Sequence, residues 1–588
     1  MIRDHFRVLV VDLGTGRGSV ATVPGRDDVA GGSGLAALLL RRYGFPDRPW
    51  DAPEQPVIFA IGPLTGYFPL MSKTVCGFKS PYHDQYAESH AGGRSALALR
   101  FADLDALVVV GRAPALSCLV VGSRRLGVQD VAFMKGMDVL ASGKLLRRMF
   151  PGSGHRSILR IGPAGERGAA TACINVETYR HFGRMGAGGA LGAKNLKAVV
   201  ILGDGDFPLP EGRAYPELFR EVHEQLTATD MMSKYHNIGT PINVTVLNEL
   251  SALPCRNLQR TRENDIGGIA GERFARDTLL RNRACAGCPV GCIHIGFIRE
   301  MFQEENQWVY RQVAYDHEPI FATGSMLGVG DAFQVLGILD AVERVGLDVI
   351  SAGVALAWAT EAAEKGLISE EETIVPLRFG DAGAYRAAVE HLGRGTNAFY
   401  RLLAEGTLKA AKVYGGAEFA CVLGQEMAGY ATGETFFVSQ ALGFRHSHLD
   451  SAGYAYDQKD VGKDARRAAD FLVEEERTRV LLTSMVACLF ARGVYTRSML
   501  ARCLDSVGYG ALAARLPDLA RDVQRLRWNL RAATGFDPEA VEIPRRFTEI
   551  RTWRGPLDGA YLGELRRAYT ARIRELMGRG DGGTPTGS

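Results

Sequence analysis

The segment RACAGCPVGCIHI at residues 283–295 constrains the fold of this chain more than any other feature. It places three thiols, those of Cys285, Cys288 and Cys292, within one short loop. Three thiolates can bind three irons of a [4Fe–4S] cluster or most of a zinc site, and both centres need a fourth ligand. Cys488, in SMVACLFARG, is one candidate for that ligand, although a buried apolar cysteine is an equally good interpretation of it.

Composition excludes several classes of protein. The chain has 588 residues, which is too many for one hydrophobic core and indicates roughly three domains. Its net charge is only +3, with acidic and basic residues interspersed, so we expect no nucleic-acid partner. Ten cysteines do not form a disulfide framework at this length. The N-terminus lacks the pattern of a signal peptide, and no uncharged apolar stretch reaches transmembrane length. We therefore expect a cytoplasmic protein with reduced thiols and no membrane partner.

Hydrophobic periodicity divides the chain into three parts. Residues 1–205 contain short β-branched runs bounded by Gly, Pro or Asp, which predict a β-rich domain. The texture becomes helical near 206, and a second boundary is predicted near 415. We thus expect a mainly helical domain at 206–415 with three cysteines and another at 416–588 with Cys488. The predicted strands are VLVVDL, PVIFAIG, ALVVVG, SCLVVGS and KAVVILG, and the predicted helices lie in 213–233, 331–365, 383–415 and 460–492.

Two glycine-rich segments have both structural and functional interpretations. GRMGAGGALG (183–192) lacks the context of a dinucleotide-binding fingerprint, because it follows the polar stretch TYRHFGR and only a short segment separates it from the predicted strand KAVVIL. It is either a tight turn between helix and sheet or a backbone nest for an anion, with Arg184 beside it. The pair Gly92 and Gly93 precedes a helical stretch whose N–H groups can receive phosphate, but a plain helix start is favoured.

The remaining polar motifs are weak when taken singly. Glu318 enters an apolar segment next to His317, where desolvation can raise its pKa and suit it to proton transfer. A surface acid or a helix cap is the simpler interpretation. His446 and His448, in FRHSHLD, lie at i and i+2, which is not the usual spacing of helical metal ligands.

Taken together and in order, these motifs resemble the aldehyde ferredoxin oxidoreductase family. The resemblance covers nearly the whole chain and is closest in IGPAGERGAATACINVETYRHFGRMGAGGALGAKNLKAVVI. It also includes VDLGTGRGSV, SHAGGRSALALRFADLDALVVVGRA, RACAGCPVGC, GLDVISAG and ACLF. It implies an α+β fold, in which an N-terminal domain of two β-sheets forms a base and two mainly helical domains cover a cofactor.

The resemblance also assigns ligands. It implies that Cys285, Cys288, Cys292 and Cys488 bind a [4Fe–4S] cluster beside tungsten, or molybdenum, carried by two pterins. The two pterin phosphates are expected to be bridged by Mg²⁺. The residues expected to contact this cofactor are Lys73, His90, Gly92, Gly93, Arg184, Gly186, Gly188, Glu343, Asp348 and His448.

The same resemblance implies the chemistry. Glu318 matches the general base, His446 matches the histidine near the metal, and His317 is the third candidate catalytic residue. An aldehyde would be oxidised with water as Glu318 takes a proton and His446 donates a hydrogen bond to the developing oxyanion. Electrons would leave through the cluster to ferredoxin or another low-potential carrier, such as a small iron–sulfur subunit. The reverse reduction of a small-molecule substrate is equally compatible with these residues.

Several positions depart from the family pattern. Thr483 replaces a pterin-binding acid, and Lys73 replaces an arginine and so loses its planar fork. Gly337 and Asp340 replace the E-x-x-H pair that binds an interfacial iron, so we expect no such iron and at most a homodimer without it. These changes indicate a divergent member. Two alternatives stay open, a non-catalytic or electron-transfer subunit with the same fold and a structural zinc site at the three cysteines.

Overall fold

The N-terminal part of the chain forms two six-stranded sheets. The computed structural model describes residues 3–152, 155–302, 307–459 and 461–578. The strand orders are β2-β1-β6-β3-β4-β5 in the first sheet and β11-β10-β9-β12-β7-β8 in the second. The strands are β1 (Phe6–Asp12), β2 (Arg17–Val23), β3 (Val57–Ala60), β4 (Thr74–Lys79), β5 (Tyr86–Ala91), β6 (Ala106–Val110), β7 (Ser117–Gly122), β8 (Leu126–Asp130), β9 (His155–Arg160), β10 (Ile174–Val176), β11 (Arg180–Phe182) and β12 (Leu196–Gly203).

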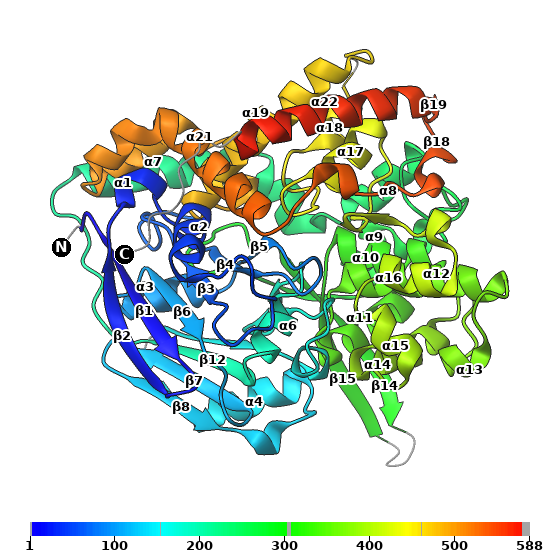
Figure 1. The fold of residues 1–588 in the computed structure, drawn as a ribbon, viewed down its shortest axis with the longest axis horizontal. Helices are drawn as coiled ribbons and strands as arrows, with labels where there is room; N and C mark the ends of the chain where they lie inside the picture. The colour runs from blue at the N-terminus through cyan, green and yellow to red at the C-terminus, as the bar shows by residue number, and fades with distance from the viewer. Residues whose placement is uncertain (1–2, 153–154, 303–306, 460, 579–588) are drawn as a thin grey trace.

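All five predicted strands are present, as β1, β3, β6, β7 and β12. Their apolar side chains meet in one core shared by both sheets, for example Val11 and Phe59 from the first and Leu119 and Ile201 from the second. Helices α3 (Ser95–Phe101) and α6 (Ala187–Gly192) contribute to the same core. The two sheets therefore form one packed base, at the left and bottom of Figure 1, as the family resemblance implies.

The predicted helix at 331–365 is two helices, α11 (Ala332–Val345) and α12 (Val349–Glu364). Gly346 ends α11 in the left-handed conformation, with φ 77°, and Asp348 then caps α12 by accepting from the backbone N–H of Ile350 at 3.2 Å. This break places the side chain of Asp348 at a helix start rather than on a helix face. The predicted stretch 383–415 is likewise divided, into α14 (Ala382–Arg394), α15 (Ala398–Leu403) and α16 (Thr407–Tyr414).

Helices cover the sheets on the right and top of Figure 1. The predicted stretches 213–233 and 460–492 correspond to α7 and α19. The long helices of this region are α7 (Ala214–Ala228), α17 (Glu434–Leu442), α19 (Ala465–Ser484), α20 (Arg497–Ser506), α21 (Gly510–Ala533) and α22 (Gly559–Met577). Helix α2 (Gly32–Tyr43) lies in the N-terminal part. The boundary predicted near 415 stays a prediction.

No single helix among the described residues is long and apolar enough to cross a membrane, although the bent pair His317–Leu327 and Ala332–Val345 passes by length and composition.

A three-stranded antiparallel sheet interrupts the region that was expected to be mainly helical. It has the order β13-β14-β15, with β13 (Leu279–Arg283), β14 (Ile293–Phe302) and β15 (Gln307–Tyr315). The alternating run IHIGFI in β14 carries the strand period that predicts it. The loop between β13 and β14, residues 284–292, contains the three clustered cysteines. This sheet thus supports the loop that most constrains the fold.

A buried ion pair joins the first sheet to the C-terminal helices. Glu88 on β5 accepts hydrogen bonds from Arg527 on α21 at 2.7 and 3.1 Å, and both side chains are almost fully buried. Burial alone would raise the pKa of Glu88, but Arg527 and His90 hold it well below its usual range. The pair therefore links residues 439 positions apart.

Replacing Arg527 with methionine leaves the Glu88 carboxylate buried without its main partner. Removing one member of a buried ion pair costs about 3–5 kcal/mol of unfolding free energy. We expect Arg527→Met to lower the thermal midpoint strongly, measured by differential scanning calorimetry. The exposed Arg521 on the same helix serves as the control, because Arg521→Met should change stability by only about 0.5 kcal/mol. Equal effects of the two substitutions would contradict this role.

Candidate functional site

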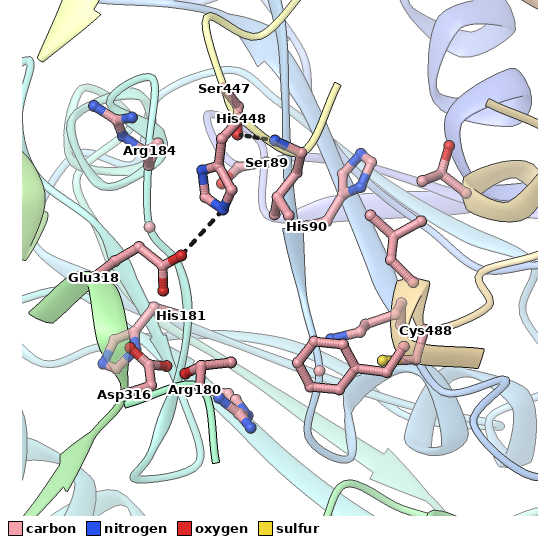
Figure 2. Close-up of a pocket in the computed structure, with 18 of the residues that line it drawn as sticks. Ser89, His90, Arg180, His181, Arg184, Asp316, Glu318, Ser447, His448 and Cys488 are labelled. Atoms are coloured by element: carbon pink, nitrogen blue, oxygen red, sulfur yellow. Dashed lines mark hydrogen bonds and ion pairs between the residues drawn. The ribbon is translucent and has the colours of Figure 1, made fainter. Parts of the chain in front are cut away.

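A cavity of about 460 Å³ lies between the base and the helices. Figure 2 shows its lining side chains converging from β5, β11, α10 (His317–Thr323) and the segments near 447 and 488. Of the residues proposed from sequence, eleven line it: Lys73, His90, Gly92, Arg184, Cys285, Cys288, Cys292, Glu318, Asp348, His448 and Cys488. The structure therefore gathers most of the predicted site into one place.

The four cysteines share one wall of this cavity. The backbone around Leu70 ties their two segments together, since Cys488 N–H donates to the Leu70 carbonyl at 2.9 Å and Leu70 N–H donates to the Gly287 carbonyl at 3.2 Å. Gly92 lies against them, because a Cβ at this position would be 2.6 Å from the Cys285 Sγ. Cys488 thus lines the same cavity as the three clustered cysteines, and its role as the fourth ligand stays a prediction.

Two cations face these thiols. The Arg180 guanidinium lies with Nη2 3.5 Å from the Cys292 Sγ, and Lys73 lines the same wall. Burial raises the pKa of the Cys285 thiol, but Arg180 and Lys73 outweigh burial and bring that pKa below its ordinary value. Burial in turn lowers the pKa of Lys73, and the Cys488 and Cys285 thiolates more than reverse this. Sequence reasoning missed Arg180, whose motif TYRHFGR carries no recognisable signal.

Glu318 projects into the opposite side of the cavity (Figure 2). Its Oε1 accepts a hydrogen bond from the Tyr430 hydroxyl at 2.9 Å and lies 3.1 Å from the His448 Nε2. Burial raises the pKa of Glu318, but these contacts dominate and hold it below its usual range. The other oxygen, Oε2, has no hydrogen-bond partner among the described residues. The ionised Glu318 carboxylate therefore presents one free oxygen to the cavity. Tyr430 was not identified from sequence because it lies 112 residues from Glu318.

Asp316 is a further carboxylate on the cavity wall that sequence reasoning missed. It precedes α10, two residues before Glu318. Burial raises the pKa of Asp316 to about 7, and the negative charge of Glu318 adds to this effect. The cavity therefore holds one carboxyl group that is ionised at neutral pH and a neighbour that titrates there.

Asp348 and Arg184 belong to a closed polar network on a third side. Arg184 Nε donates to Asp348 at 3.2 Å and its Nη2 donates to the Glu426 carbonyl at 2.6 Å. The Ser351 hydroxyl lies 2.6 Å from Asp348 and 2.8 Å from the Glu426 carboxylate. The Nη1 of Arg184 is buried without a hydrogen-bond partner among the described residues. Arg184 is thus held rigidly while one of its donors remains available to a ligand.

His90 and Thr483, two of the residues that depart from the family pattern, belong to a second polar network. The Ser33 hydroxyl lies 2.8 Å from a Glu88 oxygen and 3.0 Å from the Thr483 hydroxyl. The His90 ring contacts Glu88 at 3.1 Å and the Arg445 guanidinium at 3.2 Å. Burial, and then the charge of Arg445, lower the pKa of His90 to about 4. Glu88 also lines the cavity and was not identified from sequence.

The structure corrects the two other histidine assignments. His446 lies outside this cavity, with Nδ1 2.8 Å from the Ala441 carbonyl and Nε2 against Arg531. Burial, and then Arg531, hold the pKa of His446 well below its usual value, so the neutral ring has both nitrogens engaged. His317 is also fully buried and does not line the cavity; its ring packs against Tyr430 at 5.0 Å. Of the two histidines in FRHSHLD, His448 lines the cavity and His446 does not.

Four predicted cofactor residues do not line this cavity and have structural contacts within the chain. Gly186 and Gly188 allow close packing, since a Cβ would lie 2.4 Å from Pro81 or from the Cys173 carbonyl, respectively. This close packing favours the interpretation of GRMGAGGALG as a tight turn between helix and sheet. Gly93 accepts from the Ala286 N–H at 2.9 Å and so supports the cysteine loop. Glu343 lies outside the main cavity and accepts from Asn175 at 2.8 Å, while the His181 ring that it also contacts at 2.7 Å reaches the cavity.

Asp340, one of the positions matched to the interfacial iron site, is buried and pairs with Arg344 at 2.7 Å and with Arg311. The other position, Gly337, packs near the Arg386 side chain. The carboxylate of Asp340 is therefore already engaged. The expectation of no iron at this place stays a prediction.

The donor set of the cavity fits the cofactor that the sequence resemblance implies. Four thiols lie on one wall with two cations beside them, which suits an anionic iron–sulfur cluster. Arg180 Nε, Arg184 Nη1 and His448 Nδ1 are buried donors or acceptors without partners among the described residues, and all three side chains line the cavity. Such atoms are expected where a polar ligand completes the hydrogen bonding. The fold and the cavity thus define an α+β protein with a polar, thiol-lined cavity between two sheets and a helical cover.

The chain belongs to the aldehyde ferredoxin oxidoreductase family. The family's N-terminal domain matches residues 8–203, and its domains 2 and 3 match residues 217–587. The chain is 28% identical to the tungsten-containing aldehyde ferredoxin oxidoreductase of Pyrococcus furiosus, over 93% of this chain and 90% of that protein. It is 31% identical to the protein of the same description from Pyrococcus horikoshii, over 64% of this chain and 62% of that protein, less than two thirds of its length.

Two other similarities come from multi-component systems. The chain is 28% identical, over 68% of its length and 66% of the relative's, to an aliphatic sulfonate oxidoreductase WOR-like subunit from Pyrococcus furiosus. Its fold is similar to a chain of the active site complex BamBC of benzoyl coenzyme A reductase in complex with 1,5-dienoyl-CoA. That match has a TM-score of 0.82 and 18% identity and covers 97% of this chain and 95% of the other. At this identity it shows the fold alone.

The raised pKa of Asp316 predicts a pH-dependent effect on stability. Protonated Asp316 contributes its full stabilisation of the fold when the pH is below the pKa of an unfolded aspartate, about 4. This contribution is lost as the pH rises through about 7. Asparagine stays neutral throughout. The thermal midpoint of Asp316→Asn should therefore rise relative to wild type between pH 4 and 7 and then level off. A difference that does not change across this range would contradict the assignment, and the exposed Asp522→Asn is the control.

Proposed function

We propose that this protein is an oxidoreductase with a tungsten, or molybdenum, bis-pterin centre beside one [4Fe–4S] cluster. It converts an aldehyde and water into a carboxylic acid, two protons and two electrons, or runs the reverse reduction. The electrons pass singly through the cluster to ferredoxin or a similar low-potential carrier. The observation that carries this proposal is the convergence of four thiols on one wall of a cavity whose other walls hold Glu318 and Arg184.

The protein's part in the reaction follows from the geometry of Glu318. When bound, the metal and its pterins supply the two-electron chemistry. The ionised Glu318, held by Tyr430 and His448 through Oε1, keeps Oε2 available to take a proton from water attacking the carbonyl carbon. His448, rather than His446, is then the residue in place to hydrogen-bond to the substrate oxygen. Apolar and aromatic side chains elsewhere in the cavity lining, including Tyr454 and Leu489, limit the access of water.

Arg184, Asp348 and Lys73 are the residues proposed to hold the pterins. The free Arg184 donor suits a phosphate, and the Asp348 carboxylate suits the amino and ring N–H groups of a pterin. No group of three or more His, Cys, Asp or Glu side chains in the described part of the chain is placed to hold a single metal ion. A Mg²⁺ between pterin phosphates would therefore take phosphate and water oxygens as its main ligands.

The same observation disfavours the zinc alternative. A zinc ion needs its sulfur ligands about 2.3 Å away and hence close to one another. A [4Fe–4S] cluster instead presents one iron to each of four thiolates and accommodates a wider arrangement. All four cysteines line this cavity, and no group of three or more His, Cys, Asp or Glu side chains in the described residues is placed to hold one ion, which supports the cluster over zinc.

Metal analysis of anaerobically purified protein tests the cofactor assignment. We expect roughly four irons and one tungsten or molybdenum per chain, with broad absorption at about 400 nm. Cys488→Ser should lose most of the iron, because the remaining thiols lie in one loop. Cys503→Ala, a buried cysteine on α20, is the matched control and should keep its iron. Full iron in the Cys488 variant, or zinc in place of iron in the wild type, would refute the cluster assignment.

Glu318→Gln distinguishes a catalytic protein from a subunit that only keeps the fold. Loss of a general base lowers turnover by about 10²–10⁴-fold, and we expect such a loss in aldehyde-dependent reduction of a viologen dye. The content of iron and of tungsten or molybdenum should stay at the wild-type level.

The exposed Glu474→Gln variant, on α19, is the control and should keep full activity. Unchanged dye reduction in the Glu318 variant would remove the catalytic assignment. A wild-type protein with iron but without tungsten or molybdenum would favour the electron-transfer alternative.

A further inference from the structure

One face of the β13–β15 sheet carries arginine and aromatic side chains into solvent. Strand register sets its composition, because directly opposed residues share a face and alternate residues along a strand do too. Arg299 opposes Tyr310, Met301 opposes Trp308, and Arg281 opposes Ile295. We call this the basic face, defined by Arg281, Arg283, Arg299, Met301, Trp308, Tyr310 and Gln312. Figure 1 shows the β14–β15 hairpin projecting away from the helices.

The apolar part of the basic face is unusually open. Trp308 is 47% exposed and Tyr310 is 65% exposed, although aromatic side chains of this size are normally covered. The Arg299 guanidinium lies 4.0 Å from the centre of the Trp308 ring and 5.6 Å from that of Tyr310. Aromatic side chains stacked with arginine are typical of the central part of protein interfaces.

The charge of the basic face has one sign. Among the described residues, no ion pair joins Arg281, Arg283 or Arg299 to a carboxylate, and Arg281 instead donates to Gln312 at 2.6 Å. The one acidic residue of the described parts of these strands, Glu300, belongs to the opposite face and pairs with Arg386 at 2.7 Å. An acidic surface is therefore the complement that this face selects.

One end of the basic face lies next to the cysteine loop, although Ile293 and Ile295, which oppose Arg283 and Arg281, are buried. β13 ends at Arg283, two residues before Cys285, and β14 begins at Ile293, directly after Cys292. Within the loop, Ala284 and Gly287 are exposed. A protein seated on this sheet would lie beside the backbone that holds the proposed cluster. Electron transfer weakens steeply with distance, so a carrier gains most by docking at this place.

We propose that the basic face is the docking surface for an acidic iron–sulfur electron carrier. This inference rests on the proposed function, because it makes the cysteine loop the point where electrons leave. A second copy of this chain would bring like charges together at the same face. A single-stranded nucleic acid could also use arginine and aromatic side chains, but it would have no reason to lie beside a cysteine loop.

The test measures binding separately from activity. Titration calorimetry compares wild type with the double variant Arg281→Glu/Arg299→Glu, using an acidic two-cluster bacterial ferredoxin as the probe. We expect the variant to bind at least about tenfold more weakly, and we expect wild-type binding to weaken as salt is added. Iron content and dye-linked activity should stay at wild-type levels, because both substitutions lie on strands outside the loop.

A charge-matched control isolates the effect of position. Arg41→Glu/Arg42→Glu changes the net charge by the same amount on exposed residues of α2 and should bind ferredoxin nearly as wild type does. Equal affinity of wild type and the Arg281/Arg299 variant would overturn the proposal. So would a wild-type dimer that dissociates in this variant, or tighter wild-type binding to a single-stranded oligonucleotide than to ferredoxin. If the variant binds ferredoxin more weakly but the wild-type protein has no dye-linked activity, the basic face is still the docking surface. The proposed function then fails.

Discussion

Pairing of buried charges is the constraint on which the rest of this structure depends. Four thiols and the carboxylates Glu88, Asp316, Glu318 and Asp348 line one cavity, where each ionised group loses much of its hydration. The fold offsets this by placing a cation beside each cluster of acidic groups. Arg180 and Lys73 face the thiols, Arg184 faces Asp348, and Arg527 faces Glu88. Glu318 is held by Tyr430 and His448 instead, and burial raises the pKa of Asp316 and, despite Arg184, also that of Asp348.

These pairs require the three parts of the chain to fold together. Glu88 is on the first sheet and its partner is on α21, while Arg180 is on the second sheet and its thiol partners are beyond β13. The backbone of residues 70–73 joins the two cysteine segments, since Lys73 N–H also donates to the Val486 carbonyl at 3.2 Å. No part of the chain can complete the cavity alone. The sheets therefore act as a rigid base, and the helices complete the site as they cover it.

What could be predicted from sequence depended on how local the signal was. The β-branched runs predicted the strands, and the spacing of Cys285, Cys288 and Cys292 predicted a shared ligand, because both patterns lie within a few residues. Cys488 was identified as the fourth thiol only through the ordered resemblance to a family. Tyr430 and Glu88 contact their partners across more than a hundred residues, and no pattern in their own segments indicates those contacts. The break at Gly346 was missed for a different reason, since apolar periodicity continues on both sides of it and hides the turn.

The substitution at position 483 is explained by the neighbour that sequence alone did not reveal. The resemblance indicates an acid where this chain has Thr483. In the structure, the Thr483 hydroxyl is separated from the buried Glu88 carboxylate only by the Ser33 hydroxyl. A second carboxylate at this place would put two like charges in one buried site and would raise the pKa of one of them. Arg527 already pairs with Glu88. A hydroxyl at 483 keeps the hydrogen bond without that cost, and the change is consistent with a site reorganised around Glu88 and His90 rather than one that has lost its function.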